Sequence, residues 1–165
     1  MGHQSRGSQR TRKPHFDSAE QEAYLNLWRT YDRLRMLEDE LFGRYGLTAQ
    51  QYNALRLLRG SHPERLPTLA VAARLVSRAP DITRLIDRLA ERGLVDRERP
   101  ADNRRVVLVG INAAGLELLR QLDAPVRECG RKQLGHLTPD ELAEMIRLLR
   151  RARSPHEEPG GVWTE

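Results

Sequence analysis

One stretch of the sequence limits the possible folds more than any other. It contains two short helical patterns joined by a tight turn, and two short strand patterns follow directly. The first pattern is LAVAARL, the turn is VSRA, and the second pattern runs from Pro80 to Arg92. The strand patterns LVDRER and RRVVLVGI flank the turn PADN, which is typical of a β-hairpin. Helix, turn, helix and hairpin in this order predict a winged helix-turn-helix.

Longer helical patterns flank this unit on both sides. From Asp17 the chain has no Gly or Pro until Gly43, and its apolar residues recur at steps of three and four, so one long helix is predicted. Thr48 opens a second helix, Asn112 opens a fifth, and a capping box at Thr138 opens a sixth that ends at about residue 151. The predicted fold class is mainly α with a small β-hairpin (α+β), with helices at both ends for dimerisation.

The composition changes at both ends of the chain. Residues 1–16 are rich in Gly, Ser, Arg and His without an apolar period, which predicts a disordered basic tail, and 153–165 predicts a flexible C-terminal tail. The long terminal helices carry more apolar surface than one short domain can bury by itself. This excess favours a homodimer. The single domain at 17–152 has a helix-turn-helix core at about 47–112 and dimerisation helices at about 17–43 and 112–152.

The placement of charge bears on function more than its total does. The net charge is +5, and all but Lys13 and Lys132 of the 28 basic residues are Arg, whose planar fork binds phosphate bidentately. The N-terminal tail carries most of the net charge and has no acidic residue before Asp17, so the remaining body is almost neutral. A nucleic-acid function therefore has to depend on where individual arginines lie.

Several function classes find no support in the sequence. Cys129 is the single cysteine, so no intramolecular disulfide can form, and we expect it to be a partly buried, inert thiol and not a redox sensor. The chain has no run of membrane-spanning length and no signal peptide, which predicts a soluble cytoplasmic protein. Scattered histidines and the lack of a phosphate loop or a nucleophile–base set predict no catalytic residue, no metal and no cofactor, hence no enzyme.

The second helix of the predicted motif is the candidate reading element. Its apolar residues repeat at i, i+3, i+4 and i+7, while Arg84 and Arg88 lie on the other side with Asp81 and Thr83 beside them. A merely solvated face, including Asp87, would explain this pattern equally well. The hairpin favours DNA, because an arginine at its tip can enter the minor groove while the helix occupies the major groove.

The hairpin tip itself carries a pair of arginines. Arg104 and Arg105 follow the PADN turn directly, and Arg97 and Arg99 precede it. An edge strand protected by charge would explain one arginine. Such a pair beside further arginines is better explained by a polyanionic partner.

The stretch LAVAARLVSRAPDITRLIDRLAERGLVDRERPADNRRVVLVGINAAG resembles the DNA-binding core of MarR-type transcriptional regulators. The Ser-Arg turn, ITRLIDRL, GLV.R and the wing fall in order and at the right separations, and the resemblance covers roughly residues 17–152. The chain departs from the pattern at Ala-Pro-Asp around residue 80, where many members have Ser or Thr. The wing positions that match are Asp102, Arg104, Leu108, Gly110, Ile111 and Gly115.

The resemblance implies a homodimeric repressor whose long first helix and last two helices intertwine. Each subunit would read one half of a pseudo-palindromic double-stranded operator, with half-sites about one helical turn (~10 bp) apart. Arg104 would enter the minor groove, held by a charge-assisted hydrogen bond from Asp102. The predicted DNA-binding residues are Ser77, Arg78, Asp81, Thr83, Arg84, Arg88, Asp102, Arg104 and Arg105.

Many MarR-type regulators bind a small phenolic or aromatic ligand between the dimer helices and the DNA-binding part. The resemblance therefore implies ligand contacts from Tyr24, Trp28, Tyr31 and Tyr52, although a dimer core would use the same aromatic stripe. The alternative function is a winged-helix protein-interaction module whose basic tail binds polyanions non-specifically.

Overall fold

The computed structural model describes residues 15–77, 81–101 and 103–157. The chain divides into two compact units, residues 1–35 and 36–165. Helix α1 (Ala19–Gly43) begins in the first unit and ends in the second. Its start agrees with the sequence, because the hydroxyl of Ser18 accepts the backbone N–H of Gln21 at 3.2 Å. Nearly all of the predicted basic tail lies outside the described residues.

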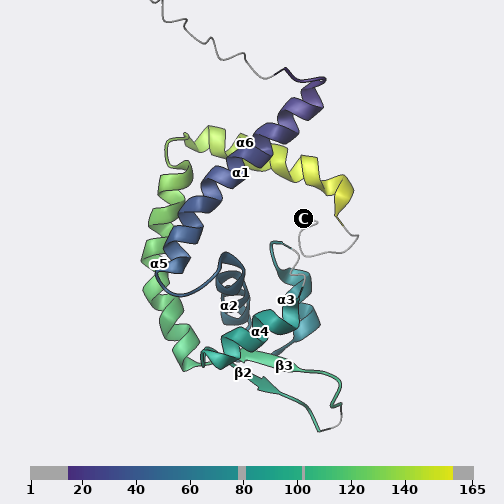
Figure 1. Cartoon of the computed structure of the whole chain (residues 1–165), viewed down its shortest axis with the longest axis vertical. Coiled ribbons are helices and arrows are strands. Elements are labelled where there is room, and N and C mark those ends of the chain that lie inside the picture. Colours follow the sequence, from purple (N-terminus) through teal and green to yellow (C-terminus); the bar gives the residue numbers. More distant parts are fainter. Residues whose placement is uncertain (1–14, 78–80, 102, 158–165) are drawn as a thin grey trace, which may run out of the picture. The chain divides into compact units, whose positions relative to one another are not determined.

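The second unit contains the winged helix-turn-helix. Figure 1 shows α2, α3 and α4 grouped beside the β2–β3 hairpin. The described elements are mostly helical with a small antiparallel sheet, which confirms the predicted fold class. In chain order they are α2 (Ala49–Ser61), β1 (Leu66–Pro67), α3 (Thr68–Arg74), α4 (Ile82–Glu91), β2 (Val95–Glu98), β3 (Leu108–Ile111), α5 (Ala113–Leu134), α6 (Pro139–Arg153) and a 3-10 turn at Ser154–His156.

The sequence predicts a short extended piece at Arg65 to Pro67 in addition to the hairpin. The sheet has three strands in the order β1-β3-β2, because this piece pairs with β3 as strand β1. Leu66 pairs with Val109 and Val95 pairs with Ile111, both antiparallel. The hairpin strands are shorter than predicted. At the tip the backbone forms turns instead of strand pairs: the Asn103 N–H donates to the Pro100 carbonyl at 3.2 Å, and the Val106 N–H donates to the Asn103 carbonyl at 3.1 Å. On the other side of β3, the Val107 carbonyl accepts both the N–H and the hydroxyl of Thr68, at 3.0 and 3.1 Å.

Helix boundaries follow the capping side chains. The predicted capping boxes at Thr48 and Thr138 are present, and the Asn112 side chain caps α5. The predicted fourth helix starts later than expected, at Ile82, because Asp81 is its N-cap and its carboxylate accepts the Arg84 N–H at 2.9 Å. The predicted first helical residue, Pro80, lies outside the described residues.

Three further boundaries differ from the sequence prediction. The sequence predicts that Thr68 caps the third helix, but Thr68 is the first residue of α3, and its hydroxyl donates to the Val107 carbonyl. The sequence predicts that the second helix ends at Gly60, but α2 continues to Ser61. Helix α6 extends to Arg153, two residues beyond its predicted end. The flexible C-terminal tail predicted from residue 153 falls mostly outside the described residues.

One apolar core joins α2, α3, α4, the sheet and α5. Burying a leucine or isoleucine side chain contributes about 1.5–3 kcal/mol at most, so this cluster supplies much of the driving force for folding. Leu85, Ile86 and Leu89 place three of the buried side chains on α4. The largest fully buried side chains are Leu55, Leu58, Ile86, Leu89, Leu119, Leu122, Val71 and Val109.

The start of α5 packs against the end of α4 with no space to spare. A Cβ atom on Gly115 would lie 2.3 Å from the Leu94 carbonyl oxygen and 2.7 Å from Cγ1 of Ile111. The Leu94 carbonyl is backbone and Ile111 is buried, so neither can move away cheaply. Gly130, in the same helix, has nothing within 4 Å of the corresponding point.

We therefore predict opposite effects for one substitution at these two glycines. Gly115→Ala should lower the free energy of unfolding by about 1–3 kcal/mol, because a methyl group overpacks the site. Gly130→Ala should raise it by about 0.5–1 kcal/mol, because alanine loses less backbone entropy in a helix. Urea denaturation followed by circular dichroism measures both. A Gly115→Ala protein as stable as Gly130→Ala would show that the corner is not tightly packed.

Candidate nucleic-acid interface

Helix α4 presents a polar face from a fixed base. Leu85, Ile86 and Leu89 are buried in the core. On the other side Thr83, Arg84 and Arg88 are exposed, as the sequence predicted. Because the apolar face is buried in the core, the rotation of the helix is fixed and these side chains face outward. The free N–H groups and partial positive charge of the helix start also favour phosphate.

Asp81 has a structural task at the start of this helix. Its carboxylate caps α4 through the Arg84 N–H, which accounts for an acidic residue at an otherwise cationic surface. The sequence predicted a DNA contact for Asp81. Its exposed position does place it beside Thr83 on the same surface.

The turn before α4 is tied to α2. The Val76 N–H donates to the Asn53 side-chain oxygen at 3.1 Å, and the Gln50 amide donates to the Ser77 hydroxyl at 3.5 Å. Ser77 is exposed, so the predicted contact residue lies on the outer surface of this turn. Arg78, predicted beside it, lies outside the described residues.

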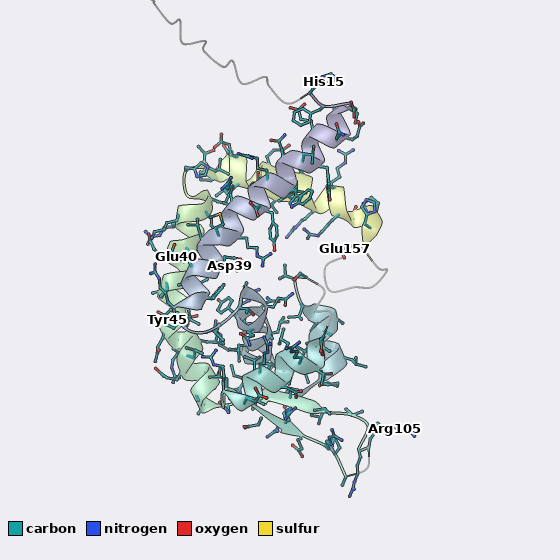
Figure 2. All side chains as sticks on the ribbon, in the orientation of Figure 1. His15, Asp39, Glu40, Tyr45, Arg105 and Glu157 are labelled. Atoms are coloured by element: carbon teal, nitrogen blue, oxygen red, sulfur yellow. The ribbon has the colours of Figure 1, made fainter. Side chains whose placement is uncertain are left out.

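The tip of the hairpin is a turn built around Asn103. Its side-chain oxygen accepts the Arg105 N–H at 3.3 Å, and its carbonyl accepts the Val106 N–H at 3.1 Å. Arg104 and Arg105 occupy this turn and are both exposed, and Figure 2 shows Arg105 at the far end of the hairpin. The structure therefore places the predicted arginine pair at the wing tip. Asp102, predicted to hold Arg104, lies outside the described residues.

An ion pair connects the wing to the reading helix. Arg97 of β2 donates through its guanidinium to the carboxylate of Asp87 on α4. The sequence treated Asp87 as a solvated residue, so this pair was missed. The sequence shows opposite charges at these two positions, but only the fold shows that the two side chains form an ion pair. The pair restricts how the base of the hairpin can tilt relative to α4.

A second bridge crosses the sheet. Arg65, just before β1, pairs with Glu98 of β2, with Nε and Oε2 3.5 Å apart. Its aliphatic stem passes over Gly110 of β3, where an added Cβ would be 3.0 Å from Cγ of Arg65. The small residue at this position in the wing motif thus gives room for the bridge.

Another arginine outside the predicted set holds the loop between α1 and α2. Arg92, the C-cap of α4, donates to the carbonyl oxygens of Tyr45 and Gly46 at 2.9 and 2.6 Å. Gly46 has φ 64°, a left-handed conformation that favours glycine. The loop before α2 is therefore attached to the end of the reading helix.

The predicted aromatic ligand residues fall in both units. In the first unit Tyr24, Trp28 and Tyr31 are exposed, and the rings of Tyr24 and Trp28 have centroids 6.3 Å apart. In the second unit Tyr52 is half-buried and stacks on Phe42, with ring centroids 4.5 Å apart. Burial raises the pKa of the Tyr52 hydroxyl above its ordinary value. Tyr52 is thus partly a core residue.

Cys129 is buried on α5, and burial raises the pKa of its thiol, with the carboxylates of Glu38 and Glu40 acting in the same direction. A raised pKa disfavours the thiolate, which is the reactive form. This geometry agrees with the inert thiol that the sequence predicted.

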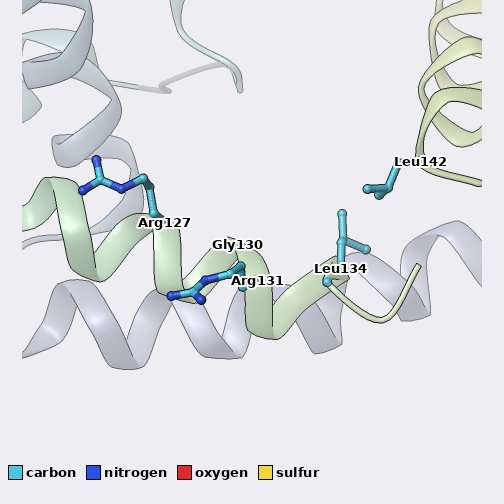
Figure 3. A pocket seen from close by; sticks show the side chains of 6 residues that line it. Arg127, Gly130, Arg131, Leu134 and Leu142 are labelled. Carbon is cyan, nitrogen blue, oxygen red and sulfur yellow. The ribbon is translucent and has the colours of Figure 1, made fainter. Parts of the chain in front are cut away.

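A hollow of about 530 Å³ lies where α5 approaches the start of α6. Figure 3 shows Arg127 and Arg131 of α5 on one side of it and Leu142 of α6 on the other. None of its lining residues is aromatic, so it is not the predicted aromatic site. The six lining residues are Arg127, Gly130, Arg131, Leu134, Gly135 and Leu142.

Two further features are absent from the part of the chain that the structure describes. No group of three His, Cys, Asp or Glu side chains there could hold a metal ion. Within those same residues no helix is both long and apolar enough to cross a membrane.

Comparison with known proteins agrees with this geometry. A model of the MarR family matches residues 45–106, which include α2, α3, α4, β2 and the wing tip. A MarR transcription factor of known structure from Planctomyces limnophilus is 61% identical to this chain, with a TM-score of 0.67 over 82% of this chain and 98% of that one.

More distant relatives show the same fold and name a function for other proteins. A MarR family transcriptional regulator from Streptomyces coelicolor, solved in complex with DNA, has a TM-score of 0.79 at 19% identity and covers 92% of this chain and 97% of that one. The homoprotocatechuate degradative operon repressor of Escherichia coli is 26% identical over 106 residues, 64% of this chain and 70% of the repressor. The chain belongs to the MarR family, and is a DNA-binding transcriptional regulator and not an enzyme.

Proposed function

We propose that the protein is a repressor that binds a pseudo-palindromic operator as a homodimer. The observation that carries this proposal is the joint placement of α4 and the wing. Exposed arginines on α4 belong to the same compact unit as the exposed arginine pair at the hairpin tip. Repression itself is supported by the Escherichia coli relative, which is named an operon repressor.

In this proposal α4 lies in the major groove. Thr83, Arg84 and Arg88 would face base edges and phosphates, because they share the exposed side of the helix. Ser77 and Arg78 in the preceding turn would contact the DNA backbone. Asp81 contributes mainly by fixing where the helix begins.

The wing would reach the adjacent minor groove. Arg104 is the proposed minor-groove side chain, because narrow minor grooves concentrate negative potential that attracts arginine. Asp102 would orient it through a charge-assisted hydrogen bond, and Arg105 would contact phosphate. The Asn103 turn supports this role, since its two hydrogen bonds define the direction of the tip.

The homodimer is supported by apolar surface on the terminal helices. None of the side chains of α6 is buried, although it carries five large apolar residues. In the first unit Leu27, Trp28 and Tyr31 of α1 are between 46% and 61% exposed. Apolar surface of this extent is typical of an interface. A second copy of the chain is the proposed partner, and a two-fold dimer would match a palindromic operator.

We also propose a small aromatic or phenolic effector that releases the operator. Its proposed contacts include Tyr24 and Trp28, whose exposed rings lie close enough to stack with a planar ligand.

Selection from random DNA duplexes tests the main proposal. The chain lacking residues 1–16 should be used, because the basic tail would bind any duplex through its charge. We expect enrichment of a pseudo-palindrome with half-sites about one helical turn (~10 bp) apart. Recovery of unrelated sequences would overturn sequence-specific binding and favour the protein-interaction module.

Arg104→Ala should weaken operator binding by about ten- to a hundredfold, because an arginine contact to base edges in a DNA groove contributes about 1–3 kcal/mol. The dimer should remain intact. Arg120→Ala is the matched control, since Arg120 is also exposed but pairs with Glu117 on α5. Fluorescence anisotropy measures affinity, and sedimentation measures the dimer. An Arg104→Ala protein that dissociates or unfolds would instead assign this residue a structural task.

Isothermal titration calorimetry with a panel of small aromatic acids tests the effector. We expect saturable heat with at least one compound, and its loss in Trp28→Ala. Leu69→Ala, which removes another exposed apolar side chain, from α3, should keep the binding. A flat titration across the whole panel would remove the support for an effector of this class.

A further inference from the structure

Helix α6 carries a groove that the described chain leaves open. The groove has a volume of about 690 Å³, and Leu148 beside it is 49% exposed. Exposed apolar surface next to charged residues is typical of a protein–protein contact. The residues that line it are Leu137, Asp140, Glu141, Glu144, Met145, Leu148 and Leu149.

One flank of this groove is a row of four charges. Asp140, Glu144, Arg147 and Arg151 follow one another at steps of four, three and four, so they share one side of the helix. All four are exposed. The row reads acidic, acidic, basic, basic from the N-terminal end. A row with this order is complementary to a second copy of itself only when that copy runs in the opposite direction.

The spacing within the row defines a single register. In an antiparallel pair of identical helices the same flank faces itself across a two-fold axis. If Asp140 lies opposite Arg151 of the partner subunit, then Glu144 lies opposite Arg147 of the partner subunit. Both pairs have the same midpoint along the helix, between Met145 and Ile146. One two-fold axis therefore satisfies all four charges, whereas a parallel pair would bring the acidic halves side by side.

The same register fills the groove. With the axis between Met145 and Ile146, Leu148 of the partner subunit lies level with Ala143. That level falls between Glu141 and Met145, which both line the groove. The exposed Leu148 of each copy is thus placed to enter the groove of the other. Charge complementarity therefore selects the register, and the burial of Leu148 is compatible with it.

An ion pair already present in α6 does not prevent this contact. Arg147 donates to Glu144 through Nε at 2.8 Å and Nη2 at 2.6 Å, and both side chains remain more than half exposed. A guanidinium has five donors, and a carboxylate accepts about four hydrogen bonds. Each group therefore keeps hydrogen-bonding capacity for the facing copy.

We propose that α6 of two copies pairs antiparallel, with Asp140 facing Arg151, Glu144 facing Arg147, and Leu148 of each copy in the groove of the other. This inference rests on the homodimer proposed above and adds the register of one of its contacts. The register matters for function because α6 and the reading elements belong to one chain, so the pairing contributes to the spacing between the two reading helices.

Charge reversal within the row gives the test. Asp140→Arg with Glu144→Arg makes the row wholly basic, and Arg147→Glu with Arg151→Glu makes it wholly acidic. Each double variant alone should dimerise at least about tenfold more weakly than the natural chain, because attractive pairs become repulsive. An equimolar mixture of the two should recover a dimer, which sedimentation equilibrium measures. Recovery on mixing also shows that neither variant is merely unfolded.

The fourfold variant that combines all these changes reads basic, basic, acidic, acidic. We expect it to dimerise with itself but not with the natural chain, a result that only the antiparallel register explains. Arg150→Glu is the matched control for Arg151→Glu, because it makes the same charge change about 100° away around the helix. Only Arg151→Glu should weaken the dimer, and its effect should shrink in high salt.

The outcomes separate this inference from the proposal on which it rests. A natural chain that forms dimers, together with reversed variants that dimerise equally well, would overturn the α6 pairing and leave the homodimer in place. A natural chain that sediments as a monomer at all concentrations would overturn both. Dimers of the double variants that persist alone and do not exchange on mixing would also overturn the register.

Discussion

The corner between the end of α4 and the start of α5 is the joint on which the arrangement of this protein depends. The Asn112 side chain caps α5 through the Gly115 N–H and donates to the Gly93 carbonyl at 3.0 Å, while its backbone N–H donates to the Leu94 carbonyl at 3.3 Å. Gly115 has no side chain and so permits this approach. The reading helix, the wing and α5 therefore pack together within one compact unit.

This joint gives the proposed dimer contacts a direct influence on DNA binding. In the proposed dimer, two reading helices match two half-sites only at one separation, and α5 and α6 would set that separation. The Asp87–Arg97 pair and the attachment of Arg92 to the α1–α2 loop stiffen the same unit from other sides. A change at the dimer helices can therefore reach the wing without any contact to DNA.

Local patterns predicted most elements of this fold, because helix periodicity and caps such as Thr48 and Thr138 act over a few residues. The exposed face of α4 and the arginine pair at the wing tip were also predicted, since periodicity and turn chemistry place them. The β1–β3 pairing, the shortened hairpin strands and the Asp87–Arg97 pair were not. The β1–β3 pairing and the bond between Thr68 and the Val107 carbonyl join residues far apart in the sequence, so they have no local signal. Asp87 and Arg97 lie on separate elements, and only folding brings their charges together.

Arginine use shows how sequence and tertiary structure divide the information. The sequence by itself determined the winged helix-turn-helix and the positions at which arginines face outward, because these follow from short-range periodicity and turn chemistry. Tertiary structure decided which arginines bind their own chain. Arg92 binds backbone carbonyls, and Arg97 binds a carboxylate. Arg84 and Arg88 form no ion pair with any described residue. The physical reason is that an arginine's partner is set by distance in space, and only folding brings distant carboxylates and carbonyls within hydrogen-bonding reach.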